Sequence, residues 1–175
     1  MRSKGIILAV LLIAGLMAII YVAKNKEAPS SGAIEGLSAP ELILQDMSGK
    51  SYTLSDLRGS VLFINFWATW CLPCREEMPF IQNLYNHFKE EKGFRMLTIL
   101  YRDDYLKALA YLNENNFHLP LFIDKEYRTA SAYGVMGVPE TYIVDKKGIL
   151  KERKLGPARW DSPQAISFIS RLSQE

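Results

Sequence analysis

The two cysteines of this chain follow directly after a segment with the character of a fully buried strand, and this arrangement limits the fold more than any other feature. Residues 61–67 are apolar at nearly every position, which is typical of a strand buried on both faces. A helix is predicted over residues 71–89 and a second buried strand over residues 95–100. Because a strand, a helix and a strand at this separation form a right-handed crossover, the two strands are expected to be parallel.

The rest of the chain adds further strands and helices to this unit. Apolar residues at helical spacing predict two more helices, and turn residues between short apolar runs predict two pairs of strands. The expected elements are strands at 42–44 and 51–53, a helix at 103–115, a hairpin of strands at 141–144 and 149–155, and a last helix that begins at Asp161 or Ser162. This order predicts an α/β sandwich with a mixed sheet.

The segment Trp70-Cys71-Leu72-Pro73-Cys74 is suited to thiol chemistry. At a helix start, the first thiol lies where unpaired backbone N–H groups point and where the helix dipole is positive, and both effects stabilise a thiolate. A free cysteine has a pKa of about 8.5, whereas cysteines at such sites have values between roughly 3.5 and 7.5. Cys71 is therefore the expected nucleophile, and Cys74, one turn inside the helix, is the expected resolving thiol.

Two other uses of the cysteine pair have weaker support. A C-x-x-C pair is also half of a zinc site, but Zn²⁺ takes four ligands, and the remaining candidates are His87 and His118, which stand 31 positions apart. A purely structural disulfide would close so short a loop that it would remove little entropy from the unfolded chain. We therefore expect a redox site and no bound metal.

A second feature is an 18-residue run without a charged side chain, at residues 6–23. A helix of that length spans roughly 27 Å, close to the hydrocarbon core of a bilayer at about 30 Å. We interpret it as a transmembrane anchor that follows a short cytoplasmic N-terminus at residues 1–5. The alternative is a cleaved signal peptide, whose apolar region would be shorter. Residues 24–36 are rich in Ala, Pro, Ser, Gly and Glu and are interpreted as a flexible linker to a domain at residues 37–175.

Composition excludes several classes of protein. The formal net charge is only +2, and outside residues 1–35 the 17 basic side chains are balanced by 17 acidic ones. A nucleic-acid partner is therefore not expected. Two cysteines in 175 residues are too few for a scaffold held together by disulfides.

Two segments together resemble one known family. Residues 63–79, which include the two cysteines, resemble the active-site segment of the membrane-anchored thioredoxin-like proteins of the TlpA and ResA type, with CcmG as a relative. Residues 137–145, Gly-Val-Pro-Glu-Thr-Tyr-Ile-Val-Asp, are similar to the second signature of that family. The resemblance runs from about Leu37 to the C-terminus. It implies a thioredoxin-like α/β/α sandwich with a mixed central sheet and a central insertion that includes the helix at 103–115.

The resemblance also implies roles for individual residues. Cys71 would attack a substrate disulfide and Cys74 would resolve the mixed disulfide. The Val138–Pro139 bond would be cis, and the Val138 backbone would pair with the bound peptide. Pro79 matches the helix kink of the family. Four aromatic or basic residues are candidates for lining a substrate groove, with packing or solvated surface as an equal alternative for each: Tyr101, Arg102, His118 and Tyr133. Met136, just before the second signature, is a slightly better candidate for contact, and Trp70 is a supporting residue of the site.

Two further positions concern the supply of protons. Asn65 stands where ordinary thioredoxin has a buried acid, and an amide cannot shuttle a proton. Glu77 occupies the position of a functional acid in the ResA and CcmG type, and its i to i+3 spacing from Cys74 places it on a neighbouring patch of helix surface. The alternative for Glu77 is an ordinary solvated carboxylate, as expected for Glu76.

The predicted function is that of a membrane-tethered thiol–disulfide oxidoreductase whose domain lies on the extracytoplasmic side of the cytoplasmic membrane. Trp-Cys-x-Pro-Cys, with Trp70 and Pro73, resembles the reducing members of the family. The resemblance suggests an apocytochrome c haem-binding segment as substrate and a membrane electron donor of the CcdA or DsbD type. No cofactor is expected besides the redox-active disulfide. The alternatives are a reductant of copper-site cysteines or a general redox protein and, in another class, a copper-binding assembly factor.

Overall fold

The computed structural model describes residues 12–17 and 32–175. The chain divides into two units, residues 1–30 and 31–175, and each is considered by itself. In the first unit, residues 12–17 are helical and exposed. Most of the predicted anchor and linker therefore lies outside the described residues. Among the helices that the structure describes, none is long and apolar enough to cross a membrane.

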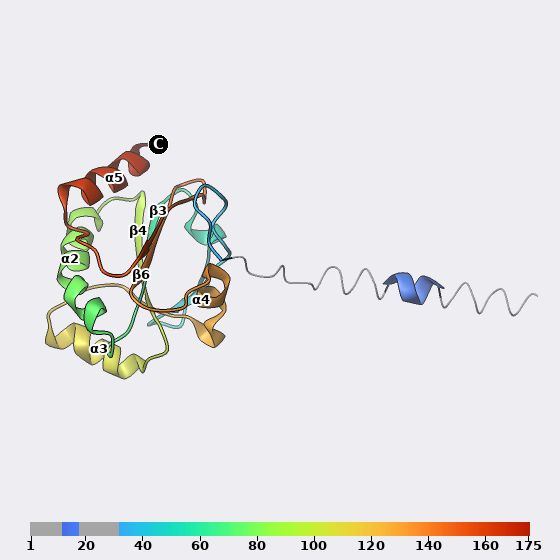
Figure 1. The fold of residues 1–175 in the computed structure, drawn as a ribbon, viewed down its shortest axis with the longest axis horizontal. Coiled ribbons are helices and arrows are strands. Elements are labelled where there is room, and N and C mark those ends of the chain that lie inside the picture. The colour runs from blue at the N-terminus through green and yellow to red at the C-terminus, as the bar shows by residue number, and fades with distance from the viewer. Residues whose placement is uncertain (1–11, 18–31) are drawn as a thin grey trace, which may run out of the picture. The chain divides into compact units, whose positions relative to one another are not determined.

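The second unit is built on one mixed sheet with helices on both of its faces (Figure 1). Within residues 32–175, seven strands form this sheet in the order β2-β1-β5-β4-β3-β6-β7. The strands are β1 (Ile43–Asp46), β2 (Ser51–Thr53), β3 (Val61–Trp67), β4 (Phe94–Leu100), β5 (Leu121–Ile123), β6 (Glu140–Val144) and β7 (Leu150–Leu155).

The pairing of the strands confirms the mixed sheet that the sequence predicts. β3 and β4 are parallel, in the register Val61 with Phe94 through Trp67 with Leu100. β4 and β5 are also parallel, while β6 pairs antiparallel with β3 and forms an antiparallel hairpin with β7. β1 pairs antiparallel with both β2 and β5. β3 thus lies inside the sheet, and every one of its residues is buried.

The helices cover the two faces unequally (Figure 1). Residues of α2 (Leu72–Phe88), α3 (Tyr105–Glu114) and α5 (Pro163–Gln174) share one apolar cluster with Phe63 and Trp67 of β3. Residues of α4 (Arg128–Tyr133) belong to a second cluster with Leu62, Ile64 and Phe66. Because successive side chains of a strand point to opposite faces, β3 contributes alternately to the two clusters. Short 3₁₀ turns, η1 (Ser55–Leu57) and η2 (Lys125–Tyr127), complete the unit.

The starts of three helices follow from their capping residues. Cys71, Asp104 and Ser162 are the N-caps of α2, α3 and α5, and each accepts a hydrogen bond from a backbone N–H of the first turn. Such side-chain caps satisfy N–H groups that have no partner inside the helix. The predicted helices at 71–89 and 103–115 are confirmed within two residues at each end. α2 continues through Pro79.

The segment assigned to the central insertion contains more than the predicted helix. Between β4 and β6 the chain forms α3, then β5, then η2 and α4. Only helical segments were expected between these two strands, so the omission of β5 was wrong. β5 has three residues, too few for alternation of apolar and polar side chains to be visible in the sequence. It pairs with β4 on one side and with β1 on the other.

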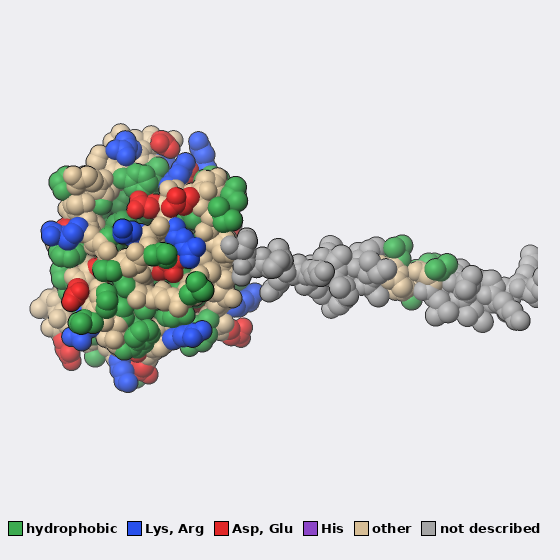
Figure 2. All heavy atoms as spheres, viewed as in Figure 1, with side chains coloured by type: hydrophobic (Ala, Val, Ile, Leu, Met, Phe, Trp, Pro, Cys, Tyr) green, Lys and Arg blue, Asp and Glu red, His purple; other side chains and the backbone are tan. Residues whose placement is uncertain are grey.

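The surface of this unit carries no single dominant charge on the face shown in Figure 2, where Lys and Arg side chains are interspersed with Asp and Glu. This distribution agrees with the balanced composition of the domain. Steering of a partner by bulk charge is therefore not a property of this face.

Candidate redox-active site

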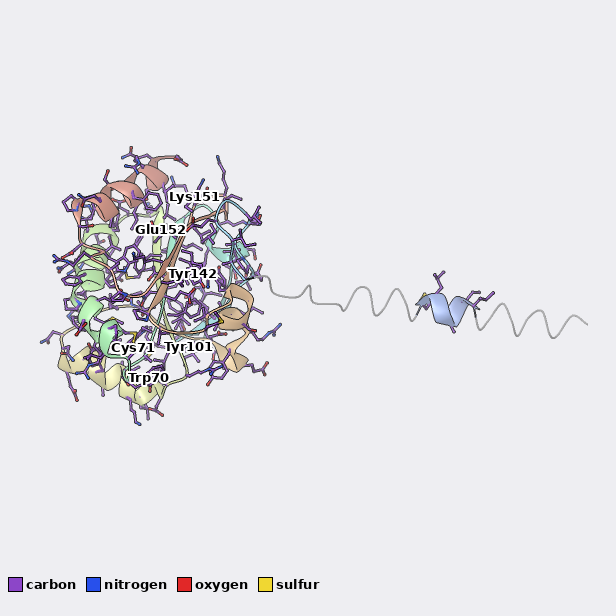
Figure 3. The ribbon with its side chains drawn as sticks, viewed as in Figure 1. Trp70, Cys71, Tyr101, Tyr142, Lys151 and Glu152 are labelled. Carbon is purple, nitrogen blue, oxygen red and sulfur yellow. A yellow bond between two sulfur atoms is a disulfide. The ribbon has the colours of Figure 1, made fainter. Side chains whose placement is uncertain are left out.

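The two cysteines lie at the junction of β3 and α2, where they form a disulfide (Figure 3). The S–S distance is 2.08 Å and the Cα atoms are 5.3 Å apart. Cys71 is the N-cap of α2, and its Sγ accepts a hydrogen bond from the Cys74 N–H at 3.2 Å. Cys71 keeps 4% of its surface exposed and Cys74 keeps none. An incoming sulfur atom therefore meets Cys71 first, and the helix start is arranged to stabilise its thiolate.

The loop that carries Cys71 is fixed by contacts to the segment that follows β4. The Thr69 N–H and hydroxyl both donate to Asp103 Oδ2 at 2.6 Å. The Trp70 indole N–H donates to the Arg102 carbonyl at 3.2 Å, while 60% of the Trp70 surface remains exposed. Trp70 thus presents an apolar face beside the disulfide, where a partner protein can contact it.

Loss of the Asp103 carboxylate should loosen this loop. We expect Asp103→Ala to lower the free energy of unfolding by roughly 1 to 3 kcal/mol, because the two Thr69 donors lose their acceptor. Urea unfolding of the oxidised protein measures the change. Thr69→Val removes only the hydroxyl donor and should cost less than Asp103→Ala. If both variants lowered the free energy of unfolding equally, the hydrogen bond from the Thr69 backbone N–H to Asp103 would contribute nothing to stability.

The loop before β6 forms the other side of the site. The Val138–Pro139 peptide bond is cis, as the resemblance implied. Cys71 Sγ lies 3.4 Å from the Val138 carbonyl oxygen. Met136, two residues earlier, is 91% exposed. The backbone of Val138 is therefore placed next to the sulfur atom that a substrate must reach.

Glu77 of α2 is a buried acid. Only 1% of Glu77 is exposed, so the alternative of a solvated carboxylate is wrong for Glu77, whereas Glu76 is exposed as expected. Its Oε1 accepts a hydrogen bond from Asn65 Nδ2 at 3.0 Å, and its Oε2 accepts one from the Ala158 N–H at 3.1 Å. Burial raises the pKa of Glu77 from its ordinary 4.5 to about 7, although these two donors act in the opposite direction.

Asn65 connects this acid to the sheet. Its Nδ2 donates to Glu77 and also to Thr141 Oγ1 of β6, at 2.9 Å. Its Oδ1 is buried and has no hydrogen-bond partner among the described residues. Asn65 therefore holds Glu77 on the face of β3 that faces α2. A neutral amide in β3 is thus in direct contact with a buried acid in α2.

The remaining candidates divide between the site and the core. Arg102 lies at the site through its carbonyl group. Tyr133 is fully buried in the cluster on the opposite face of the sheet, and Tyr101 is 6% exposed, so both are packing residues, which was the alternative to a place in a substrate groove. His118 is bound through its backbone N–H to Gln82 of α2. Pro73 occupies the first turn of α2, where a missing N–H costs nothing.

Three contacts of the site were not foreseen from the sequence: those of Asp103, of Ala158 and of Thr141. Ala158 acts through its backbone, which no residue type reveals, and it lies 81 positions from Glu77. Asp103 lies three residues after the end of the second buried strand, which is a weak signal for the carboxyl edge of a parallel sheet. Within the described part of the chain, no group of three or more His, Cys, Asp or Glu side chains is placed to hold a metal ion.

The fold and the site together define a class. A dithiol–disulfide pair at a helix start, opposite a cis-proline loop in a thioredoxin-like α/β sheet, can exchange an electron pair with a second disulfide. The protein is a thiol–disulfide oxidoreductase of thioredoxin-like fold.

Comparison with known proteins identifies the family. Residues 36–153 match the model of the AhpC/TSA family, and the chain belongs to that family. It is 32% identical over 146 residues to "Thiol-disulfide oxidoreductase ResA" of Geobacillus thermodenitrificans, covering 83% of this chain and 82% of the relative. It is also 32% identical over 144 residues to ResA of Bacillus subtilis, covering 82% and 78%.

Solved structures agree with this assignment. A crystal structure from Chlorobium tepidum, assigned as thiol:disulfide interchange protein DsbE, matches with a TM-score of 0.70 and 27% identity, over 81% of this chain and 99% of the other. The solution structure of a thiol:disulfide interchange protein from a Bacteroides species matches with a TM-score of 0.68 and 23% identity, over 82% of this chain and 92% of the other. The second likeness concerns the fold alone.

Proposed function

We propose that this protein is a membrane-tethered reductant of disulfides outside the cytoplasm. The observation that carries the proposal is the position of Cys71 Sγ, between the N-terminus of α2 and the Val138 carbonyl, with the buried Glu77 one turn beyond Cys74. This arrangement supplies a stabilised thiolate, a backbone edge for a peptide and an acid that titrates near neutral pH.

The reaction begins from the reduced form, in which both cysteines carry thiol groups. The Cys71 thiolate attacks one sulfur of the substrate disulfide, a mixed disulfide forms, and the released substrate thiolate takes up a proton. Cys74 then loses its proton and attacks Cys71 Sγ. The intramolecular disulfide forms, and the second substrate sulfur leaves and is protonated. Two electrons and two protons have then passed to the substrate.

Glu77 is suited to accept the proton that Cys74 releases. Cys74 is fully buried, so water reaches its thiol poorly, and Glu77 follows it by three residues on the same helix. A carboxyl with a pKa of about 7 is present in both protonation states at neutral pH, which is the condition for efficient proton exchange. Asn65 and the Ala158 N–H hold the carboxylate in place.

The location, substrate and electron donor in this proposal come from the sequence. The apolar run at residues 6–23 supports a single membrane anchor with the domain on the extracytoplasmic side, joined by the linker at 24–36. The resemblance to the ResA and CcmG type supports a disulfide in the haem-binding segment of apocytochrome c as substrate. A membrane donor of the CcdA or DsbD type would then restore the dithiol. No cofactor besides the Cys71–Cys74 disulfide takes part.

The direction of electron flow follows from the residues between the cysteines. Leu72 and Pro73 provide no imidazolium to stabilise the thiolate further, so the reduced form is not favoured strongly. We expect the reduction potential to lie near that of thioredoxin, about −270 mV, rather than near the strongly oxidising end at about −120 mV. Equilibration with glutathione buffers of known potential measures it, and a value near the oxidising end would reverse the proposed direction.

A trapping experiment identifies the substrate. We expect Cys74→Ser, expressed as the full-length membrane-tethered chain in its own cell, to accumulate mixed disulfides through Cys71, because the resolving thiol is absent. Non-reducing gels followed by mass spectrometry identify the trapped proteins, and apocytochrome c should be prominent among them. Trapped copper-site proteins would support the alternative reductant instead.

The matched control removes both thiols. The double variant Cys71→Ser/Cys74→Ser keeps the anchor and the fold but should trap nothing. If Cys74→Ser also trapped nothing while it was present in the membrane at normal levels, the protein would not reduce disulfides in that cell. Trapping of Cys71 with a membrane protein that carries its own cysteine pair would identify the electron donor.

A further inference from the structure

The segment Gly156–Trp160 connects β7 to α5 and has no regular secondary structure. We call it the strap, and in Figure 1 it is the chain that leads into α5. It passes over Glu77, since its Ala158 N–H bonds the carboxylate. The proposed role of Glu77 depends on its burial, and the strap is the segment that covers it.

The strap contacts both the cis-proline loop and the buried acid of α2. At its start, the Gly156 N–H donates to the carbonyl of the cis-proline, Pro139, at 3.0 Å. In its middle, the Ala158 N–H donates to Glu77 Oε2 at 3.1 Å. At its end, the Trp160 ring packs edge-on against Phe63 of β3, with 5.0 Å between ring centroids. The strap therefore joins the substrate-binding loop to the buried acid.

Arg159 fastens the strap to α2. Its guanidinium lies over the Phe80 ring at 4.2 Å from the centroid, and its Nε donates to Asp161 Oδ1 at 3.2 Å. The Arg159 side chain is 69% exposed, so the ion pair contributes little by itself. The contact with the aromatic face is the stronger one, because a cation over a ring is attracted by the charge distribution of the ring.

Two hollows lie beside the strap. One, of about 310 Å³, is lined by Glu77, Phe80 and Arg159, with Glu76, Pro157 and Ala158 completing it. The other, of about 410 Å³, is lined in part by Ala158, Arg159 and Trp160. Glu77 borders open space and yet is only 1% exposed. The hollows leave room beside the strap, which is held on α2 by Arg159 and elsewhere by the hydrogen bonds of Gly156 and Ala158.

We propose that the strap positions Glu77 for proton exchange with Cys74, and that Arg159 is the positioning residue that keeps the strap closed. This inference rests on the proposed role of Glu77 in disulfide reduction. In the closed arrangement, which the structure shows, Arg159 lies over Phe80 and the Ala158 N–H donates to Glu77, which is shielded from water. With the strap open, water enters from the hollow of about 310 Å³ and solvates the carboxylate.

Few charged or titratable groups surround Glu77, so its titration reports on whether the strap covers it. Its own helix contributes Cys74 and Glu76, and the strap contributes Arg159. β3 faces it with the neutral Asn65. The largest influence on its titration is burial, which exceeds that of its hydrogen bonds. Opening the strap should therefore move the midpoint of its titration down, towards that of an ordinary glutamate.

The experiment titrates Glu77 directly. Carbon-13 NMR of the Glu77 side-chain carboxyl gives the midpoint of its titration without any substrate. The measurement uses the oxidised protein, in which the cysteines form the disulfide and do not titrate. We expect Arg159→Ala to lower the midpoint by about one pH unit. Hydrogen exchange at the Ala158 amide should become about tenfold faster. Arg159→Lys keeps a cation over Phe80 and should restore both values in large part. If Arg159→Ala does not fold, Phe80→Leu removes the ring instead and should give the same shift.

The matched control is Arg171→Ala, because Arg171 of α5 also lies over an aromatic ring, Phe168, at 5.9 Å, but Arg171 lines neither of the two hollows beside the strap. It should leave the midpoint unchanged. A purely structural Arg159 would lower the melting temperature without moving the midpoint, which would overturn the inference. Failure of the proposed function is distinguishable, because a missing trapped substrate or an oxidising potential leaves this titration unaffected. The same shift should appear in the pH profile of single-turnover reduction.

Discussion

Replacement of Cys71 by serine is expected to abolish disulfide reduction, with a fall in rate of at least about a thousandfold. The serine hydroxyl is a weak nucleophile at neutral pH, whereas Cys71 occupies the helix start that stabilises a thiolate. Cys74 cannot take over the attack, because it has no exposed surface. Turnover of an insulin or glutathione-linked disulfide substrate by the reduced protein measures the loss.

The control for this prediction is the second cysteine. In the same assay, Cys74→Ser should still form about one mixed disulfide per molecule in a single rapid step, and then stop, because the resolving thiol is missing. The two variants therefore separate attack from resolution. Multiple turnovers by Cys71→Ser would show that Cys74 reaches the substrate, and that the order of the two thiols in the proposed mechanism is reversed.

Much of the fold follows from the sequence because its central elements are long and strongly patterned. The apolar run at β3 and the helical spacing in α2 predict the crossover and the parallel pair, and the turn at Gly148 predicts the hairpin of β6 and β7. β5 and α4, with three and six residues, are too short to show a period. Their structure depends on neighbours distant in the sequence, since β5 is held between β4 and β1.

The site was predictable to a different extent for each residue. The cysteines follow from their spacing and from the strand before them. The cis bond before Pro139 was implied only by the resemblance, because no local pattern distinguishes it. The burial of Glu77 was not predictable, since Glu76 and Glu77 are adjacent acids on one helix and differ in what covers them. That cover is the strap, whose Ala158 lies 81 positions further along the chain.

Glu77→Gln is expected to remove a large part of the pH dependence of stability. Burial raises the pKa of Glu77 from 4.5 to about 7, so the folded protein binds this proton more tightly than the unfolded chain does. Between about pH 4.5 and about pH 7 the unfolded chain has released the proton while the folded protein keeps it. The free energy of unfolding therefore falls as pH rises through this interval, by roughly 3 kcal/mol in total, and is constant above it.

The glutamine side chain suits this site because it keeps an acceptor for the Ala158 N–H and adds a donor. Asn65 Oδ1 has no partner among the described residues, and the amide of glutamine offers it one after rotation of the Asn65 side chain. Glu77→Gln should therefore fold, lose the fall in stability between about pH 4.5 and about pH 7, and unfold at higher urea concentration than the wild type at alkaline pH.

The measurement is urea unfolding of the oxidised proteins over this pH interval, with Glu76→Gln as the matched control. Glu76 is the neighbouring exposed acid, so its replacement should leave the fall in stability in place.

The same two variants also test the role of Glu77 in the reaction. Glu77→Gln should slow single-turnover reduction and remove its pH step near 7, because Cys74 then has no carboxylate to accept its proton. A pH step that survived Glu77→Gln would assign that titration to the thiols themselves and leave Glu77 without a part in proton transfer.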